Sequence, residues 1–321
     1  MAEQTELGVV VIGRNEGARL VQCLKALQGL AGRVVYVDSG STDDSVAQAQ
    51  RLGAEVVNLD MTQPFTAARA RNAGVAHLGQ GQQVPEFIQF VDGDCALNAD
   101  WMRTGVTFLR ANPTAAVACG RLREIAPEAS VYNQLADAEW NTPVGETKYC
   151  GGIALMRSAA LAQVSGFDSR LIAGEEPELC VRLRAAGWTI WRLEADMGWH
   201  DLAMTRFSQW WRRTRRGGMA AAQGAAMHGA PPERHKVVET RRAVLWGLVL
   251  PGVTVLGLLI TPWALVLLLI WPLQVFRLWR KGNPLVRACF LTIAKLPEGV
   301  GVAGYWWSRM TRRQQGLIEY K

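Results

Sequence analysis

Short apolar runs alternate with amphipathic stretches over the first 120 residues, and this pattern restricts the possible folds most strongly. The apolar runs predict strands, and the stretches with apolar residues at helical spacing predict helices. Because successive parallel strands need a crossover connection, the alternation predicts a mostly parallel sheet with helices on both faces. The predicted strands are 7–12, 34–37, 55–59, 87–91 and 116–119, and the predicted helices are 18–28, 43–52, 67–78 and 98–111. The fold class is therefore α/β.

Polar clusters follow three of these strands: GRNEG at 13–17, DSGSTDDS at 38–45 and DGDC at 92–95. In a doubly wound sheet, ligands bind beyond the carboxyl ends of the strands, so the clusters are expected to meet at one edge. DSGSTD by itself is also typical of a turn followed by a helix cap. Three clusters at the same edge favour a binding site over three separate caps.

Paired carboxylates occur at two places in the chain. Asp92 and Asp94 flank one glycine at the end of a predicted buried strand, where they either cap a turn or hold a positive charge. Glu175 and Glu176 lie at the start of the predicted helix GEEPELCVRLRAAGW, in which Pro177 suits the first helical position. The helix dipole favours carboxylates at that end, so this second pair reflects either helix electrostatics alone or chemistry.

The double glycine of CGGIALMR, Gly151 and Gly152, follows a less regular stretch of sequence. Such a pair is typical of a sharp turn or of a close approach of the backbone to a ligand. Just before it, residues 132–141 are compatible with a helix that turns Leu135 and Trp140 inward. The six cysteines contain no CxxC pair, so neither a disulfide framework nor a zinc site is favoured.

Seven motifs occur in one order along the chain: GRNE, VDSGSTD, ARNAG, VDGDC, GG…R, GEEPELC and GWHD. In this order they resemble the family 2 glycosyltransferases, and the resemblance covers about residues 7–216. No single motif is specific, but the ordered set is. The resemblance implies a GT-A fold, which is a Rossmann-like, mostly parallel sheet flanked by helices. It also implies the inverting transfer of a sugar from a nucleotide-diphosphate sugar, which we expect to be a UDP-sugar.

The resemblance implies a metal site as well. A divalent Mn²⁺ or Mg²⁺ would neutralise the phosphates of the donor, and such hard cations prefer carboxylate oxygens. By this resemblance Asp94 would ligate the metal directly, and Asp92 would face the ribose or the water shell of the metal. His200, in GWHD, would be a third ligand, unless it is an ordinary hydrogen-bonded residue after a strand.

Contacts to the nucleotide sugar are implied for polar residues and glycines in the same motifs. Arg71, in ARN, suits phosphate binding through its fixed fork of donors, or else lies solvated on a helix. The implied set is Asn15, Glu16, Asp38, Arg71, Asp92, Gly151 and Gly152.

The catalytic base in the family is the Asp of a Glu-Asp pair. In this chain the pair is Glu175 and Glu176, so Glu176 takes the position of the base. Because Glu is one methylene longer than Asp, this departure leaves open which of the two glutamates acts. The helix dipole would lower the pKa of Glu176, whereas Glu175 and Glu178 would raise it, and the sequence leaves the net direction open.

Residues 243–276 carry no charge and contain two apolar runs, 244–260 and 263–276. A spanning helix needs about 20 apolar residues, so the first run is borderline and the second is short. The block predicts a transmembrane or re-entrant helical hairpin. A hairpin buried in a protein core is the alternative.

Charges are segregated around this block. Residues 1–205 carry 17 Lys+Arg against 24 Asp+Glu, whereas the flanks 206–242 and 277–321 each carry nine against two. Basic flanks are typical of the cytoplasmic side, so we expect an inner-membrane protein whose catalytic domain lies in the cytoplasm. The position of the basic residues favours anionic membrane lipids, and not nucleic acid, as partners.

The segment MTRFSQWWRRTRRGG predicts a helix that lies in the headgroup layer. Its QWWRR matches only in part a Gln-x-x-Arg-Trp segment that borders the acceptor site in membrane-bound members of the family. Trp210, Trp211, Arg212 and Arg213 are therefore predicted near the acceptor entrance. A helix that only anchors the protein is the alternative.

The predicted division is a catalytic domain at 1–203, an interfacial helix and basic linker at 204–242, the hairpin at 243–276, and membrane-surface helices with a basic tail at 277–321. Within the last part, residues 285–307 predict one or two amphipathic helices, with a third span as the alternative.

The leading interpretation is a metal-dependent sugar transfer to a lipid-linked saccharide in envelope or exopolysaccharide biosynthesis. Transfer to polyprenyl phosphate itself is the runner-up, and an acceptor that is already ionised would need no base. A non-catalytic membrane scaffold built on a nucleotide fold is the alternative from another class. Whether copies associate, or join a biosynthetic complex, stays open.

Overall fold

The computed structural model describes residues 6–81 and 83–311. The chain divides into two compact units, Met1–Thr205 and Arg206–Lys321. We call them the sheet unit and the helical unit. The division falls close to the predicted border after residue 203.

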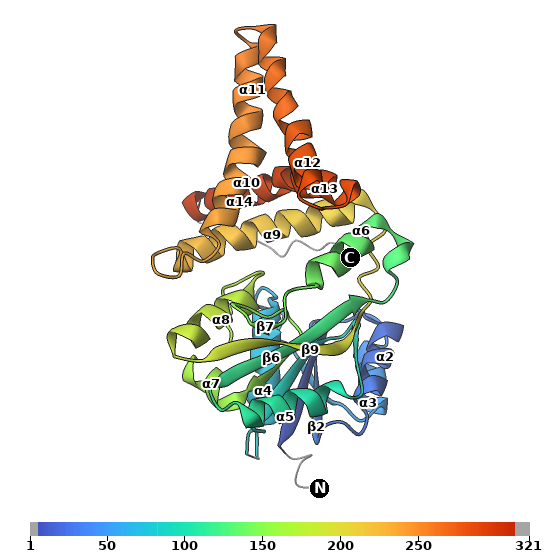
Figure 1. Ribbon diagram of the computed structural model, residues 1–321. Coiled ribbons are helices and arrows are strands. Elements are labelled where there is room, and N and C mark those ends of the chain that lie inside the picture. The colour runs from blue at the N-terminus through green and yellow to red at the C-terminus, as the bar shows by residue number, and fades with distance from the viewer. Residues whose placement is uncertain (1–5, 82, 312–321) are drawn as a thin grey trace. The chain divides into compact units, whose positions relative to one another are not determined.

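A mixed β-sheet is the centre of the sheet unit (Figure 1). Its described strands are β1 (Leu7–Gly13), β2 (Arg33–Asp38), β3 (Glu55–Asn58), β4 (Phe87–Asp92), β5 (Cys95–Leu97), β6 (Ala115–Glu124), β7 (Gly145–Glu146), β8 (Ala154–Arg157) and β9 (Thr189–His200). Their order is β3-β2-β1-β4-β8-β6-β9-β5, with β7 beside β9. The four strands from β3 to β4 are parallel, as the alternation predicts. Beyond β4 the sheet is mixed, because β8 runs antiparallel to both β4 and β6.

Helices flank this sheet, and the four predicted in the first 120 residues are present (Figure 1). The described helices are α2 (Ala18–Leu27), α3 (Ser45–Arg51), α4 (Ala67–Leu78), α5 (Trp101–Ala111), α6 (Val131–Trp140), α7 (Ser158–Gln163) and α8 (Glu175–Ala185), with a 3₁₀ turn η1 (Pro127–Ala129). In α2, the apolar stripe Leu20, Leu24 and Leu27 is buried, as its helical spacing requires. The fold class is therefore the predicted α/β class.

The register of the parallel strands brings the polar motifs to one edge. Gly13 at the end of β1 lies opposite Asp38 at the end of β2, and Ile12 lies opposite Asp92 at the end of β4. On the other side of the sheet, Cys95 of β5 lies opposite His200 of β9. The motifs that follow the strands thus meet where a sheet of this kind binds its ligands.

The helical unit contains helices only, within the part of the chain that is described. They are α9 (Phe207–His228), α10 (Val237–Val244), the π-helical η2 (Leu245–Val249), α11 (Leu250–Leu258), the 3₁₀ helix η3 (Pro262–Leu269), α12 (Ile270–Arg280), α13 (Leu285–Ile293) and α14 (Lys295–Thr311). The predicted amphipathic segment 285–307 is thus two helices. Their location on a membrane surface stays a prediction.

Glycines allow the helices of this unit to pack closely against one another. A Cβ at Gly301 of α14 would lie 2.1 Å from the carbonyl oxygen of Arg215 in α9, and one at Gly218 of α9 would lie 2.2 Å from the carbonyl oxygen of Glu298. Gly247 of η2 approaches α14 at Lys295 in the same way. Only glycine lets the helix backbones meet at these points.

Two segments of the helical unit are long and apolar enough to cross a membrane, Val237–Leu258 and Pro262–Arg280, with mean hydropathies of 1.3 and 1.5. They form a pair that projects from the other helices of this unit (Figure 1). Leu259, Ile260 and Trp263 at the tip are 81%, 88% and 80% exposed. The pair is therefore not a hairpin buried in a protein core, which was the alternative expectation.

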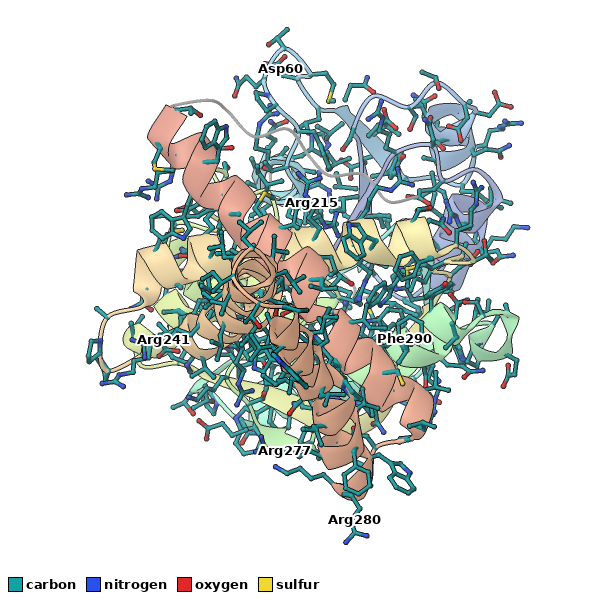
Figure 2. The ribbon with its side chains drawn as sticks, turned by 90° about the horizontal axis from the view of Figure 1, so that it is seen from above. Asp60, Arg215, Arg241, Arg277, Arg280 and Phe290 are labelled. Atoms are coloured by element: carbon teal, nitrogen blue, oxygen red, sulfur yellow. The ribbon has the colours of Figure 1, made fainter. Side chains whose placement is uncertain are left out.

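Exposed basic residues lie where the chain enters the first apolar segment and where it leaves the second. Arg241 and Arg242 lie in α10, near the start of the first segment, and Arg277, Arg280 and Lys281 lie at the end of the second. Figure 2 labels three of them, and Arg280 points outward from the ribbon. The apolar pair is thus bounded by cations, as the sequence predicts.

Candidate active site

Arg71, in α4, lies at the centre of a group of three carboxylates that come from two parts of the chain. Its Nη1 lies 2.7 Å from Oε1 of Glu175 and 2.9 Å from Oε1 of Glu176, and its Nη2 lies 3.0 Å from Oδ1 of Asp92. Arg71 is buried, which excludes a solvated residue on the helix surface. We call Arg71, Asp92, Glu175 and Glu176 the base cluster.

The start of α8 delivers the two glutamates to this cluster. The helix begins at Glu175, after Gly174 in the left-handed region with a φ of 79°. A glycine adopts this backbone conformation without strain, so the chain can turn directly into the helix. Glu175 and Glu176 therefore lie in the first turn, where the sequence predicts them.

Burial and charge perturb the protonation of the base cluster. Burial, followed by the nearby charge of Glu175, raises the pKa of Glu176 to about 7, although Arg71 acts in the opposite direction. Burial alone would lower the pKa of Arg71, yet the attraction of Glu176, Asp92 and Glu175 raises it above its ordinary value. Arg71 is thus a permanent cation, whereas Glu176 can exchange a proton near neutral pH. The sequence left open the direction in which the pKa of Glu176 is shifted, and in the structure this pKa is raised.

Gly152 closes one side of the base cluster. A Cβ at this position would lie 2.6 Å from Nη2 of Arg71, 2.8 Å from Oε1 of Glu176 and 3.3 Å from Oδ2 of Asp92. Its neighbour Gly151 has no atom within 4 Å of the corresponding position. The backbone thus approaches the side chains of the base cluster closely at Gly152, and its approach to a ligand stays a prediction.

A second group of ligand atoms lies at the junction of β5 and β9. Asp94, Cys95 and His200 each offer one ligand atom, and these atoms lie within 4.8 Å of one another. Nε2 of His200 lies 3.1 Å from Oδ2 of Asp94, and the Cys95 thiol donates a hydrogen bond to Oδ1 of Asp94 at 3.4 Å. We call these three residues the metal cluster.

The donor set of the metal cluster fits a divalent cation. The Asp94 carboxylate is almost fully buried and faces an imidazole nitrogen, and both are suitable ligands for Mn²⁺. Burial raises the pKa of the Cys95 thiol well above its ordinary value, so Cys95 is a neutral hydrogen-bond donor here. Asp92 is not part of this cluster within the described residues, because its carboxylate pairs with Arg71.

Asp38 lies at the end of β2 and organises the loop that follows. Its Oδ2 accepts hydrogen bonds from the backbone N–H groups of Gly40 and Ser41, and its Oδ1 accepts one from the hydroxyl of Tyr36. Asn15 ties the neighbouring loop to the same turn, because its Oδ1 accepts from the backbone N–H of Thr42. The DSGSTD motif is therefore a structured turn, and it lies beside the first polar motif.

Glu16 lies between the first polar motif and the aspartate motif. Its Oε2 is 2.8 Å from Nη2 of Arg19. A Cβ at Gly93, between the two aspartates, would lie 3.2 Å from Cγ of Glu16. Glu16 thus lies beside Gly93, the residue between the two aspartates, and its role in nucleotide binding stays a prediction.

The contacts that two aromatic residues make with the site were not foreseen from the sequence. Phe167 packs its ring against the Arg71 guanidinium at 5.7 Å, and Asn72 holds the loop of Phe167 by hydrogen bonds in both directions. Trp140 stacks on the His200 ring with 4.8 Å between the ring centroids. The inward turn of Trp140 was predicted, but its partner was not, since nothing local in the sequence relates residues this far apart.

The four residues predicted near the acceptor entrance all lie in α9, in the helical unit. Trp210 is buried and its ring meets the edge of Phe290 from α13 at 5.0 Å. Arg212 is exposed, whereas Trp211 and Arg213 are partly buried. Trp210 therefore contributes to the packing of the helical unit, and the placement of all four at the acceptor entrance stays a prediction.

The chain is similar to known proteins in its sheet unit above all. Residues 8–160 match the family model described as Glycosyl transferase family 2. A pre-mycofactocin glycosyltransferase of Mycobacterium tuberculosis (strain CDC 1551 / Oshkosh) is 27% identical over 239 residues, which are 70% of this chain and 48% of that protein. The chain thus spans about half the length of this relative. The succinoglycan biosynthesis protein ExoA of Rhizobium meliloti is 29% identical over 196 residues, or 57% of this chain and 59% of that protein.

Among solved structures, the mannosyltransferase PcManGT from Pyrobaculum calidifontis, in complex with GDP-Man and Mn²⁺, has a TM-score of 0.62 and 17% identity. The similarity covers 95% of this chain and 88% of that one. At this identity the likeness shows the fold, which is the GT-A fold. The match over residues 8–160, the curated relatives and the fold agree, and together they support a family 2 glycosyltransferase.

Proposed function

We propose that the protein transfers a sugar from a nucleotide-diphosphate sugar to a hydroxyl group of a lipid-linked saccharide, with inversion at the anomeric carbon. The observation that carries this proposal is the base cluster, in which Glu176 has a pKa of about 7 and lies beside Arg71 and Asp92. A carboxylate whose pKa lies near the operating pH is suited to general base catalysis.

In this reaction Glu176 accepts the proton of the acceptor hydroxyl as its oxygen attacks the anomeric carbon. The new carbon–oxygen bond forms while the bond to the donor phosphate breaks, and the nucleotide diphosphate leaves with the electron pair. Arg71 holds Glu175 and Glu176 in place by ion pairs of 2.7 and 2.9 Å. Glu175, which is more deeply buried, is the orienting partner, and Glu176 is the base.

The metal cluster would hold the cation of such a transferase. Asp94 and His200 are the ligands that this chain offers to Mn²⁺ or Mg²⁺. When bound, the cation would neutralise the negative charge of the diphosphate. The relative PcManGT was solved with GDP-Man and Mn²⁺, which supports this assignment by analogy of fold.

The nucleotide would lie across the carboxyl ends of β1, β2 and β4. Asp38 and Asn15 come from the loops at this edge and are held by hydrogen bonds to neighbouring backbone groups, so their positions are fixed before a donor arrives. We expect uridine as the base. Because the solved relative holds a guanosine donor, a panel of donors must include both.

The charge of the base cluster favours a neutral hydroxyl as the acceptor group. Asp92, Glu175 and Glu176 together outweigh the single guanidinium of Arg71. An ionised phosphate that approached Glu176 would meet like charges in a poorly solvated site. This observation favours a saccharide hydroxyl over polyprenyl phosphate, which was the runner-up.

The helical unit supports a membrane location for this reaction. Two exposed apolar segments, Val237–Leu258 and Pro262–Arg280, lie between basic flanks that suit anionic lipid headgroups. We place the protein in the inner membrane, with the sheet unit on the cytoplasmic side. A role in polysaccharide assembly is supported by the relative ExoA, whose name assigns it to succinoglycan biosynthesis.

The test is a panel of UDP- and GDP-sugars with the detergent-solubilised chain, Mn²⁺ or Mg²⁺, and native membrane lipids as acceptors. Release of nucleotide diphosphate and transfer of radiolabel to lipid are measured. We expect both from one donor, and both should stop when the metal is chelated. Absence of release and transfer with every donor would reject the enzyme and leave the non-catalytic scaffold.

A further inference from the structure

Helix α6 touches the metal cluster through Trp140. The indole of Trp140 and the imidazole of His200 are stacked, with ring centroids 4.8 Å apart and an angle of 26° between the planes. An indole carries an N–H donor and no lone pair for a metal. Trp140 therefore cannot be a ligand, and any effect on a metal must pass through His200.

The His200 imidazole needs a contact that fixes its orientation, because its χ2 torsion has only weak preferences. Rotation about χ2 of a histidine is broad, so the direction of Nε2 is not set by rotamer preference alone. The indole contacts a face of the ring and not the edge that carries its two nitrogens. In this orientation Nε2 points to Asp94, at 3.1 Å from Oδ2.

Helix α6 is itself fastened to the strand beside His200. Arg121 of β6 holds Asp137 by an ion pair of 2.8 Å, and the backbone N–H of Glu124 donates to Oδ1 of Asp137 at 3.0 Å. Asn133 donates to Oε1 of Glu124 at 3.2 Å. These contacts are buried or partly buried, and they hold the helix against β6.

Residues at the start of the same helix also form hydrogen bonds with the chain just after His200. The Ser130 hydroxyl donates to the carbonyl oxygen of Met204 at 2.5 Å, and the backbone N–H of Met204 donates to Oδ1 of Asn133 at 3.1 Å. Glu124 accepts from the backbone N–H of Leu202 at 3.2 Å. His200 is therefore held from both sides, by its ring through Trp140 and by its backbone through the segment that follows.

We infer that Trp140 is a positioning residue, which sets the plane of the His200 imidazole so that Nε2 is directed to a divalent cation beside Asp94. This inference rests on the role of His200 in the proposed function. Residues that orient a metal-bound histidine typically contribute about tenfold or more to the affinity for the metal. Loss of the indole should therefore weaken metal binding, even though no ligand is removed.

The experiment measures Mn²⁺ binding to the full detergent-solubilised chain from the electron paramagnetic resonance signal of free Mn²⁺. Trp140→Ala should raise the Kd for Mn²⁺ about tenfold, whereas Trp140→Phe, which keeps a stacking ring, should stay within about threefold of the wild type. Trp199→Ala is the matched control. Trp199 precedes His200 in β9, points to the opposite face of the sheet and is 39% exposed, so its loss should not change the Kd.

A double-mutant cycle separates positioning from simple packing. His200→Ala should weaken Mn²⁺ binding, and adding Trp140→Ala to it should cause no further loss, because the indole acts only through the imidazole. A Kd for Trp140→Ala equal to that of the wild type, or full additivity in the double variant, would overturn the inference. A lower Tm with an unchanged Kd would show that Trp140 only stabilises the fold.

The outcomes also separate this inference from the proposed function. If His200→Ala weakens Mn²⁺ binding and Trp140→Ala does not, only the inference fails. If His200→Ala binds Mn²⁺ as the wild type does, the metal role of His200 fails and the inference fails with it. Should Trp140→Ala not fold, Trp140→Leu replaces it, because leucine keeps an apolar side chain at this position but has no aromatic ring to stack on His200. Its Kd for Mn²⁺ should also rise about tenfold, and a wild-type Kd in a folded Trp140→Leu would overturn the inference.

Discussion

The two halves of the candidate site use their carboxylates in different ways. In the base cluster, Asp92, Glu175 and Glu176 share one buried guanidinium, and burial, followed by the charge of Glu175, raises the pKa of Glu176 to about 7. In the metal cluster, Asp94 faces an imidazole and a neutral thiol. One half is suited to move a proton and the other to hold a cation.

The sheet register explains how two aspartates so close in sequence serve different halves. Asp92 is the last residue of β4 and lies opposite Ile12 of β1. After Gly93 and Asp94 the chain enters β5, where Cys95 lies opposite His200 of β9. The turn at Gly93 thus leaves Asp92 beside the parallel strands and carries Asp94 to the mixed part of the sheet.

Replacement of Glu176, the proposed base, should have the largest effect on turnover. Glu176→Gln cannot accept a proton, so turnover should fall by about 10² to 10⁴, the usual contribution of a general base. Nucleotide diphosphate release measures it. Glu194→Gln, at an exposed glutamate of β9, is the matched control and should turn over normally. Wild-type turnover in Glu176→Gln would contradict the assignment of Glu176 as the base.

Loss of the central cation of the base cluster should appear mainly in stability. Arg71→Met leaves three carboxylates without their guanidinium, and breaking a buried ion pair in this way costs about 3–5 kcal/mol of unfolding free energy. Chemical denaturation measures the change. Arg103→Met removes an arginine that is 78% exposed and paired with Asp100, and its effect should be about 1 kcal/mol or less. Equal effects of the two variants would show that the base cluster is not a buried network.

The double glycine offers a test of spacing in the base cluster. Gly152→Ala would place a methyl group 2.6 Å from Nη2 of Arg71 and 2.8 Å from Oε1 of Glu176, so the side chains must shift. A misplacement of about 1 Å at an active site can lower the rate by about 10²-fold. Gly151→Ala meets no atom within 4 Å and should retain activity. Similar turnover of both variants would remove Gly152 from the site.

The most gradual expected effect is the dependence of the rate on pH. Because only ionised Glu176 accepts a proton, and its pKa is raised to about 7, kcat should rise with pH through neutrality. Below this pKa the rate should fall by about tenfold per pH unit. A pH profile of donor turnover at saturating metal tests this expectation. A rate that is flat from pH 5 to pH 8 would mean that this carboxylate does not titrate in the reaction.

The sequence predicts the parallel half of the sheet well, because each strand and helix there carries its own local pattern. Gly13, Asp38 and Asp92 follow apolar strands, and parallel pairing brings such strand ends together. The pairing of β6 with β9, and the short strands β5 and β7, could not be predicted in this way. They depend on contacts between distant segments, which leave no periodic signal in the chain.

The same limit applies to the candidate site. The motifs pointed to Arg71, Asp94, Glu176 and His200, and the structure brings Arg71 to Glu176 and Asp94 to His200. Sequence spacing could not separate Asp92 from the metal cluster, since that separation arises from the turn at Gly93. Phe167 and Trp140 have no local signature, because each acts on a partner far away in the chain.

The most direct test of the division into two halves is calorimetric binding of Mn²⁺ and the donor's nucleotide diphosphate to two variants. We predict that Glu176→Gln binds both with affinities within about twofold of the wild type, whereas Asp94→Asn, which replaces the carboxylate ligand by a neutral amide, loses Mn²⁺ affinity by more than about tenfold. Loss of Mn²⁺ binding in Glu176→Gln, or normal binding in Asp94→Asn, would contradict the division.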